Sequence, residues 1–156
     1  MKIYDIRFDL EHYALEFYCT GCTIKCKDCH NVALQDFSVG VEWQEFIKTH
    51  KIIQSIKDNK LLIKNFIILG GEPLDQNKNE LHNFLEFLHS KFSDINIWLF
   101  TGYSFDKIPD IILPFLSYAK TGKYDYKLLV DDNIQYGYKL ASSNQKITKI
   151  EHNFLG

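Results

Sequence analysis

The alternation of apolar and polar residues along the chain predicts a series of strands. Residues 13–18 alternate weakly, which is typical of a strand. Residues 66–69 are wholly apolar and are followed by two glycines, as expected for a strand that is buried on both faces. Residues 95–100 and 116–120 predict two further strands, and residues 145–150 predict a final one.

Two stretches between these strands have apolar residues at helical spacing. The first carries a stripe that consists of Trp43, Phe46, Ile47, His50, Ile53 and Ile56. In the second, between residues 81 and 92, apolar residues follow the i, i+3, i+4, i+7, i+11 pattern of an amphipathic helix. Pro109 predicts the start of a short helix that Pro114 ends.

This succession of strands and helices predicts the α/β class, with a mostly parallel sheet. The chain has 156 residues and no repeat or linker-like segment, so we expect a single domain over residues 1–156. Ligands of parallel sheets bind at the C-terminal ends of the strands. We therefore expect three segments at one edge of the sheet: the loop after Tyr18, the Gly-Gly-Glu after Leu69 and the Thr-Gly-Tyr after Phe100.

Composition and charge exclude several classes of protein. Hydrophobic residues make up 46% and charged residues 24% of the chain, which is ordinary for a folded protein. The net charge of −2 gives no basic field for a nucleic acid or an anionic membrane. No apolar run approaches the ~18 residues of a membrane span, and charges lie where a signal peptide would be apolar. The expected location is the cytoplasm.

All four cysteines fall within residues 19–29, which in a reducing compartment indicates a metal site. Only three residues separate the two Cys-x-x-Cys pairs, whereas the pairs of a structural zinc site are normally much further apart. Without Cys19, the spacing is Cys22-x3-Cys26-x2-Cys29. Three thiolates on a four-iron cluster leave one iron open, as a catalytic site requires. A structural zinc site and a one-cluster electron carrier remain alternatives.

The three-cysteine spacing resembles the signature of the radical S-adenosylmethionine (SAM) superfamily. The resemblance implies a partial (β/α) barrel in which Cys22, Cys26 and Cys29 hold a 4Fe-4S cluster and S-adenosyl-L-methionine binds the open iron. Reductive cleavage of SAM then gives a 5′-deoxyadenosyl radical that abstracts a hydrogen atom. The segment Gly70-Gly71-Glu72 lies where the superfamily has its Gly-Gly-Glu, and it is expected to hold the methionine end of SAM. Glycines let backbone carbonyls approach a ligand, and a carboxylate can accept from an ammonium group.

Further motifs narrow the resemblance to activases of glycyl-radical enzymes. They are Cys29-His30-Asn31, residues 97–103, residues 121–124 and residues 142–145, which resemble segments of the proteins that activate anaerobic (class III) ribonucleotide reductase. The implied substrate is a glycine in the large subunit of that reductase, and the implied electron donor is a low-potential protein such as flavodoxin. The protein itself needs no general acid or base, because the cofactor carries the chemistry. The alternatives are activation of another glycyl-radical enzyme and a structural zinc-binding module.

Two residues of the cysteine loop depart from the pattern or lack a role in it. Asp28 stands where relatives often have glycine or an aromatic residue, and together with His30 it is a candidate for the adenosine side of SAM. Cys19 is interpreted as a small apolar residue at the end of a strand rather than as a fourth ligand.

Overall fold

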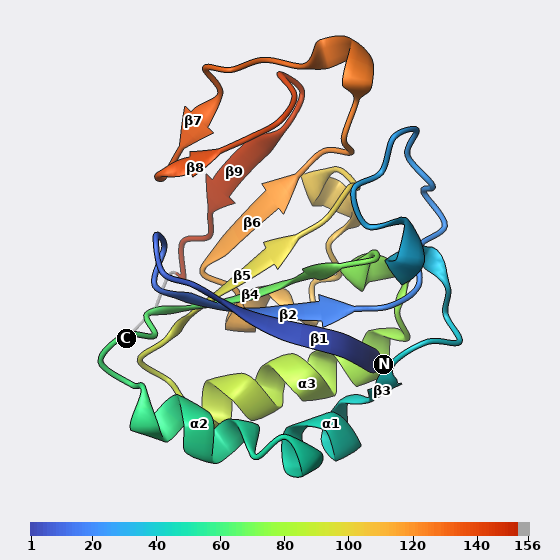
Figure 1. Cartoon of the computed structure of the whole chain (residues 1–156). Coiled ribbons are helices and arrows are strands. Elements are labelled where there is room, and N and C mark those ends of the chain that lie inside the picture. Colours follow the sequence, from blue (N-terminus) through green and yellow to red (C-terminus); the bar gives the residue numbers. More distant parts are fainter. Residues whose placement is uncertain (153–156) are drawn as a thin grey trace.

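The computed structural model describes residues 1–152 and contains a seven-stranded sheet with helices on one face (Figure 1). The sheet consists of β1 (Lys2–Asp9), β2 (Ala14–Cys19), β3 (Val41–Glu42), β4 (Asn65–Gly70), β5 (Asn96–Phe100), β6 (Tyr118–Thr121) and β9 (Lys146–Lys149). The helices are α1 (Trp43–Thr49), α2 (Ile52–Asp58) and α3 (Lys78–Lys91). Strands β7 (Ile134–Gln135) and β8 (Tyr138–Lys139) form a separate hairpin. None of the helices in residues 1–152 has the length and hydrophobicity that crossing a bilayer requires.

The strand order confirms the α/β class and shows a mixed sheet. The order is β3-β1-β2-β4-β5-β6-β9, in which β2, β4, β5 and β6 run parallel. The pairs at both sides of this parallel centre are antiparallel. A short turn joins β1 to β2, so β1 can only run antiparallel to its neighbour. Because β3 and β9 are the outer strands of an open sheet, the partial barrel stays a prediction.

Most predicted elements are present, with two differences. The stripe that begins at Trp43 forms two helices instead of one, because Lys51 between them adopts a left-handed conformation (φ 51°). The prediction of a short helix that starts at Pro109 is wrong. The nearby helical turn is the 3-10 turn Leu113–Phe115, which contains Pro114. The predicted strands correspond to β2, β4, β5, β6 and β9, and the predicted amphipathic helix is α3.

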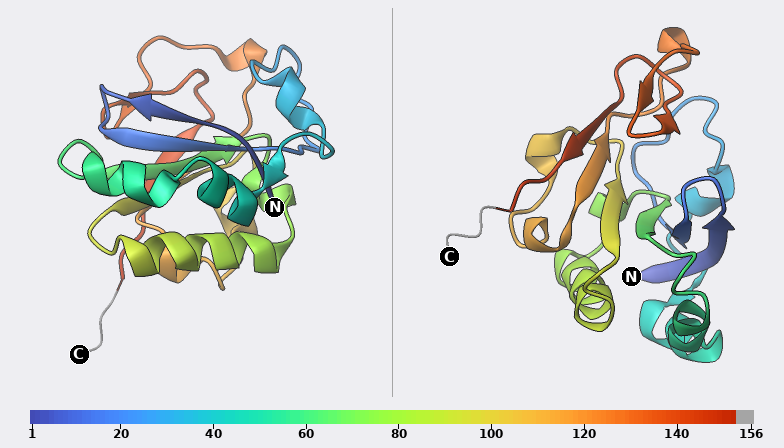
Figure 2. Two further views of the ribbon diagram at one scale, coloured as in Figure 1. Left: turned by 60° about the horizontal axis from the view of Figure 1, so that its bottom comes forward. Right: turned by 90° about the vertical axis from the view of Figure 1, so that its left-hand side faces the viewer.

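Alternate residues of the parallel strands bury side chains on opposite faces of the sheet. On one face, Phe66 and Ile68 pack against the helices, together with Phe84 of α3. On the other face, Ile67 and Trp98 belong to a smaller cluster. This second cluster is completed by the β7–β8 hairpin, which lies on the side of the sheet away from the helices (Figures 1 and 2). The sheet is thus covered on both faces.

Side-chain contacts connect the hairpin to the edge strand β9 and to the turn between β1 and β2. The side-chain carbonyl of Gln135 accepts a hydrogen bond from the Ile147 N–H at 2.7 Å, on the edge strand β9. On the other side, the ring of His12 stacks on the ring of Tyr138 with 3.8 Å between their centroids. One ring nitrogen of His12 contacts the Asp9 carboxylate and the other contacts the Gly137 carbonyl at 3.0 Å.

Both partners of the His12 ring are acceptors, so the geometry requires the doubly protonated imidazolium. Burial by itself lowers the pKa of His12, but the hydrogen bonds with Gly137 and Asp9 outweigh it and raise the pKa. The charges that act on this imidazole are the carboxylates of Asp9 and Glu11. His12 therefore stabilises the fold in its charged form.

We expect His12→Gln to lower the free energy of unfolding by about 1–2 kcal/mol at pH 5.5, because a charged hydrogen-bonded group is lost. The effect is full below the unfolded-state pKa of about 6.5, and it is lost as the pH rises through the raised folded-state pKa. Urea unfolding of both proteins between pH 5.5 and 9 measures the difference. His89→Gln, at an exposed position of α3, is the control. A difference that does not change with pH would contradict the imidazolium assignment.

Candidate metal and cofactor site

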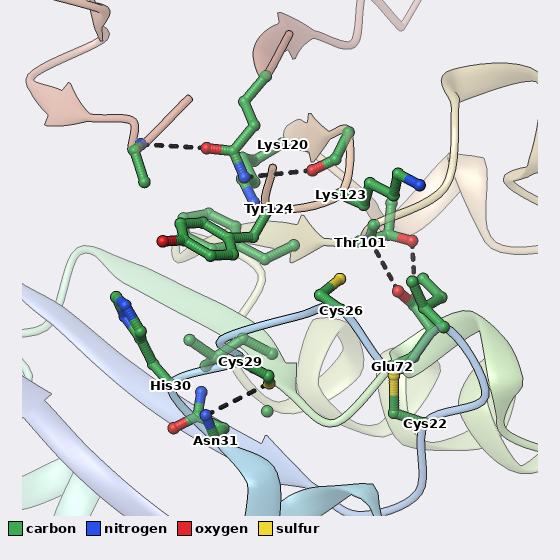
Figure 3. Close-up of a pocket in the computed structure, with 18 of the residues that line it drawn as sticks. Cys22, Cys26, Cys29, His30, Asn31, Glu72, Thr101, Lys120, Lys123 and Tyr124 are labelled. Atoms are coloured by element: carbon green, nitrogen blue, oxygen red, sulfur yellow. Dashed lines mark hydrogen bonds between the residues drawn. The ribbon is translucent and has the colours of Figure 1, made fainter. Parts of the chain in front are cut away.

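A cavity of about 330 Å³ lies at the C-terminal ends of the parallel strands. Its lining includes the thiols of Cys22, Cys26 and Cys29, the Gly70–Glu72 segment, and Thr101 with Gly102. In Figure 3 the three cysteines lie below Lys120, Lys123 and Tyr124, which come from β6 and the turn after it. The expectation that the segments after β2, β4 and β5 lie at one edge is confirmed.

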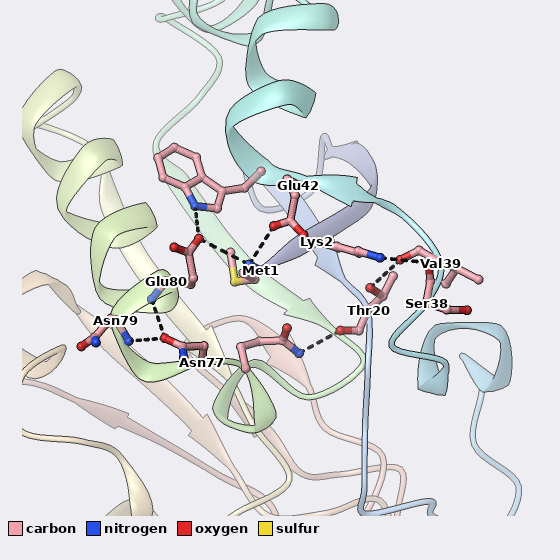
Figure 4. A network of polar contacts seen from close by, with 11 residues as sticks. Met1, Lys2, Thr20, Ser38, Val39, Glu42, Asn77, Asn79 and Glu80 are labelled. Carbon is pink, nitrogen blue, oxygen red and sulfur yellow. Dashed lines mark hydrogen bonds and ion pairs between the residues drawn. The ribbon is translucent and has the colours of Figure 1, made fainter.

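The beginning of the cysteine loop is fixed by backbone hydrogen bonds. The N–H of Gly21 donates to the Leu34 carbonyl at 2.8 Å, and the N–H of Glu72 donates to the Gly21 carbonyl at 2.8 Å. Before them, the Thr20 hydroxyl donates to the Val39 carbonyl at 2.9 Å (Figure 4). The loop therefore leaves β2 in a defined direction and passes directly over the end of β4.

The two glycines after β4 make this close approach possible. A Cβ on Gly71 would lie 2.5 Å from the Gly21 carbonyl oxygen and 2.6 Å from the Leu34 carbonyl oxygen. Gly70 has a positive φ of 117°, and a Cβ there would lie 2.5 Å from the Cys19 carbonyl oxygen. Both positions need glycine so that the cysteine loop can pack against the strand, a reason that differs from the ligand contact expected from the sequence. Both glycines also line the cavity.

The Glu72 side chain is 2% exposed and joins the ends of two strands. Its carboxylate accepts from the Thr101 hydroxyl at 2.7 Å and from the N–H groups of Gly102 and Leu74 at 2.7 and 2.9 Å. Burial raises the pKa of Glu72, although these three hydrogen bonds oppose the rise. Three protein donors therefore hold the carboxylate in place. Thr101, which the sequence marked only as part of a strand end, is a structural partner of this carboxylate.

The four thiols are in two different environments. Cys19 is fully buried in the core on the helix side of the sheet, and burial raises its pKa. Cys22 is half-buried. Burial raises its pKa as well, while backbone N–H groups of Lys25 and Ile24 favour the thiolate. The sulfur of Cys29 accepts from the Asn31 N–H at 3.4 Å. Backbone donors on these sulfurs suit thiolate ligands, which favour iron–sulfur clusters and zinc.

Cys22, Cys26 and Cys29 line one cavity, and cysteine thiolates are the ligands that hold iron–sulfur clusters. Within residues 1–152, no three His, Cys, Asp or Glu side chains are grouped closely enough to enclose one metal ion. A zinc site needs such a group, with each sulfur ~2.3 Å from the metal. The thiolates that hold a four-iron cluster surround a larger body, and Cys22, Cys26 and Cys29 all line the same cavity.

The two candidates for the adenosine side of SAM lie in different places. His30 lines the cavity, with its ring 5.3 Å from the ring of Tyr124. Asp28 is exposed, has a left-handed backbone (φ 58°) and is absent from the cavity lining among the described residues. A backbone of this kind explains why glycine is favoured at such a position.

Lys120 is a cavity residue that no sequence pattern indicated. It lies on β6, in the half-buried lining, and burial lowers its pKa to about 8, although Glu72 and Cys26 favour the charged form. In the described part of the chain no carboxylate forms an ion pair with it. The only feature of the sequence that bears on it is that Lys120 follows Ala119 within a predicted strand.

Comparison with known proteins finds one matching family and several similar proteins. Residues 13–148 match the family described as 4Fe-4S single cluster domain. Three similar proteins are anaerobic ribonucleoside-triphosphate reductase-activating proteins. That of Haemophilus influenzae is 30% identical over 111 residues, which are 69% of this chain and 71% of the relative. That of Enterobacteria phage T4 is 30% identical over 115 residues (71% and 70%), and that of Vibrio cholerae is 26% identical over 111 residues (69% and 71%).

Proposed function

The chain belongs to the family of anaerobic ribonucleoside-triphosphate reductase-activating proteins, and on this premise we propose that it is a radical SAM activase. When bound, the 4Fe-4S cluster supplies the electron for reductive cleavage of S-adenosylmethionine, and the outcome is a glycyl radical on anaerobic ribonucleotide reductase. One observation carries the proposal: the three cysteines with the superfamily spacing and the Gly70–Glu72 segment line a single cavity.

In this proposal each part of the cavity has a role. Cys22, Cys26 and Cys29 hold the cluster. The backbone of the Gly70–Glu72 segment holds the methionine end of SAM, and the Glu72 carboxylate keeps that backbone in place through its three protein donors. His30 contacts the adenosine side, whereas Asp28 acts there only if the loop turns it inward.

The barrel and the partner proteins complete the proposed activity. The sheet acts as a partial (β/α) barrel whose open side admits the glycine loop of the reductase large subunit. Leu69, Phe100 and Tyr124 give the cavity apolar walls, which help to exclude water. A low-potential donor such as flavodoxin delivers the electron.

The proposal is tested by anaerobic reconstitution followed by metal analysis. We expect about four irons with sulfide per chain and a brown colour. With a reductant, added SAM should then yield methionine and 5′-deoxyadenosine. A colourless protein with one zinc per chain would instead support the structural zinc module, and a cluster that neither binds nor cleaves SAM would support an electron carrier.

Lys120→Met is expected to weaken SAM binding by about tenfold or more, because the cavity loses an unpaired ammonium group that in this proposal pairs with the carboxylate of SAM. Titration calorimetry on the reconstituted protein measures the affinity.

Lys146→Met is the matched control. Lys146 is exposed on the neighbouring strand β9 and pairs with Thr121, so it lies on the face of the sheet opposite to Lys120. Equal SAM affinities of the two variants would remove Lys120 from the site.

A further inference from the structure

The part of the cysteine loop that carries Cys26 and Cys29 has few polar contacts with the rest of the protein. Among the described residues, Thr23 is the only one of residues 23–30 that hydrogen-bonds to another element. The same segment contains two non-glycine residues with a left-handed backbone, Lys25 (φ 48°) and Asp28 (φ 58°). Such conformations are unfavourable and persist only where surrounding contacts maintain them.

Thr23 hydrogen-bonds to Asp75, in the 3-10 turn Pro73–Asp75 that follows β4, and its hydroxyl also lies 3.3 Å from the hydroxyl of Tyr103. Oδ2 of Asp75 accepts from the Thr23 N–H at 2.6 Å and from the Thr23 hydroxyl at 2.8 Å. Oδ1 accepts from the hydroxyl of Tyr103, which follows β5, at 2.7 Å. One carboxylate thus connects the cysteine loop to the segments after β4 and β5.

We infer that Asp75 is a positioning residue that holds the cysteine loop in its cluster-binding conformation. The inference rests on the proposed function, in that Cys22 next to Thr23 is taken as a cluster ligand. The Asp75 carboxylate accepts from both the backbone and the side-chain donor of Thr23, the residue that follows Cys22.

Two substitutions separate the hydrogen bonds from the charge. Asp75→Ala removes both. Asp75→Asn removes the charge, but its amide oxygen can still accept from Thr23 and its amide N–H can donate to the Tyr103 hydroxyl. Asp106→Ala is the matched control, because Asp106 is an exposed carboxylate three residues beyond Tyr103 that accepts from the Ser104 hydroxyl.

The first measurement is hydrogen exchange on the cluster-free protein. The Thr23 amide should exchange about tenfold faster or more in Asp75→Ala, and close to the wild-type rate in Asp75→Asn and Asp106→Ala. Far-ultraviolet circular dichroism checks that the variants are folded. Should Asp75→Ala unfold, the Tyr103→Phe variant, which loses the hydroxyl that contacts both Asp75 and Thr23, is used instead and should exchange at an intermediate rate. Wild-type exchange at Thr23 in a folded Asp75→Ala protein would overturn the inference.

The second measurement uses the reconstituted protein. Iron release to a chelator should be about tenfold faster in Asp75→Ala and close to the wild-type rate in Asp75→Asn. Unchanged iron release in Asp75→Ala would overturn the inference. If the wild-type protein bound no cluster, the proposed function would fail, and the exchange at Thr23 would still decide whether Asp75 holds the loop.

Discussion

Replacement of Cys22, Cys26 or Cys29 by Ala, one at a time, is expected to abolish 4Fe-4S binding. All three thiols line the cavity, and a cluster that is already one ligand short of four loses a further thiolate in each variant. Iron and sulfide analysis after anaerobic reconstitution, together with the visible absorbance, measures the loss. SAM cleavage should disappear with the cluster.

Cys19→Ala is the matched control within the same segment. Cys19 is fully buried in the core on the helix side of the sheet, away from the cavity lining. The variant should keep its iron and lose only about 1 kcal/mol in the free energy of unfolding, as for a small core truncation. If Cys19→Ala lost iron as completely as the other variants, the three-ligand assignment would be wrong.

The second large effect is expected on addition of the anaerobic reductase. With SAM and a reductant, the protein alone should cleave SAM slowly, and the reductase should bring about the doublet of a glycyl radical in the EPR spectrum. The reason is the exclusion of water, which a radical reaction requires and which a polypeptide docked over the cavity would complete. Spin quantitation with and without the reductase measures the effect.

Two controls accompany this experiment. A reductase whose target glycine is replaced by Ala should give no doublet, and neither should the wild-type reductase with the Cys26→Ala activase. Catalytic turnover of a small molecule in the absence of any protein partner would refute the activase proposal while leaving the radical SAM chemistry in place.

The parallel centre of the fold could be predicted from the sequence because its strands are buried on both faces. Residues 66–69 have this character, and they form most of β4. Strand β1 gave no such signal, since a register shift between Ile3 and Asp5 disrupts the alternation of buried and exposed residues. The β7–β8 hairpin was missed because its turn uses Tyr136 and Gly137, both with positive φ, where asparagine or aspartate before glycine is the usual signal.

The parts of the site that lie in short contiguous motifs could be predicted from the sequence. The cysteine spacing and the Gly-Gly-Glu are contiguous patterns, and their meeting at one edge follows from parallel connectivity. The hydrogen bonds of Asp75 with Thr23 and of Glu72 with Thr101 connect residues that are far apart in the sequence. No periodicity or motif encodes such pairs, because they depend on how the loops cross after the strands have formed.

The hydrogen bond from Ile147 to the side chain of Gln135 has a consequence for self-association. An outer strand with free N–H groups is a template for intermolecular β-pairing and aggregation. In β9 the amide at the middle of the strand is already engaged by the Gln135 side chain, and Lys146 and Lys149 place charges at both ends of the strand. The Gln135 side chain therefore occupies an N–H group that an added strand would need. We expect Gln135→Ala to shift the protein toward aggregates at high concentration.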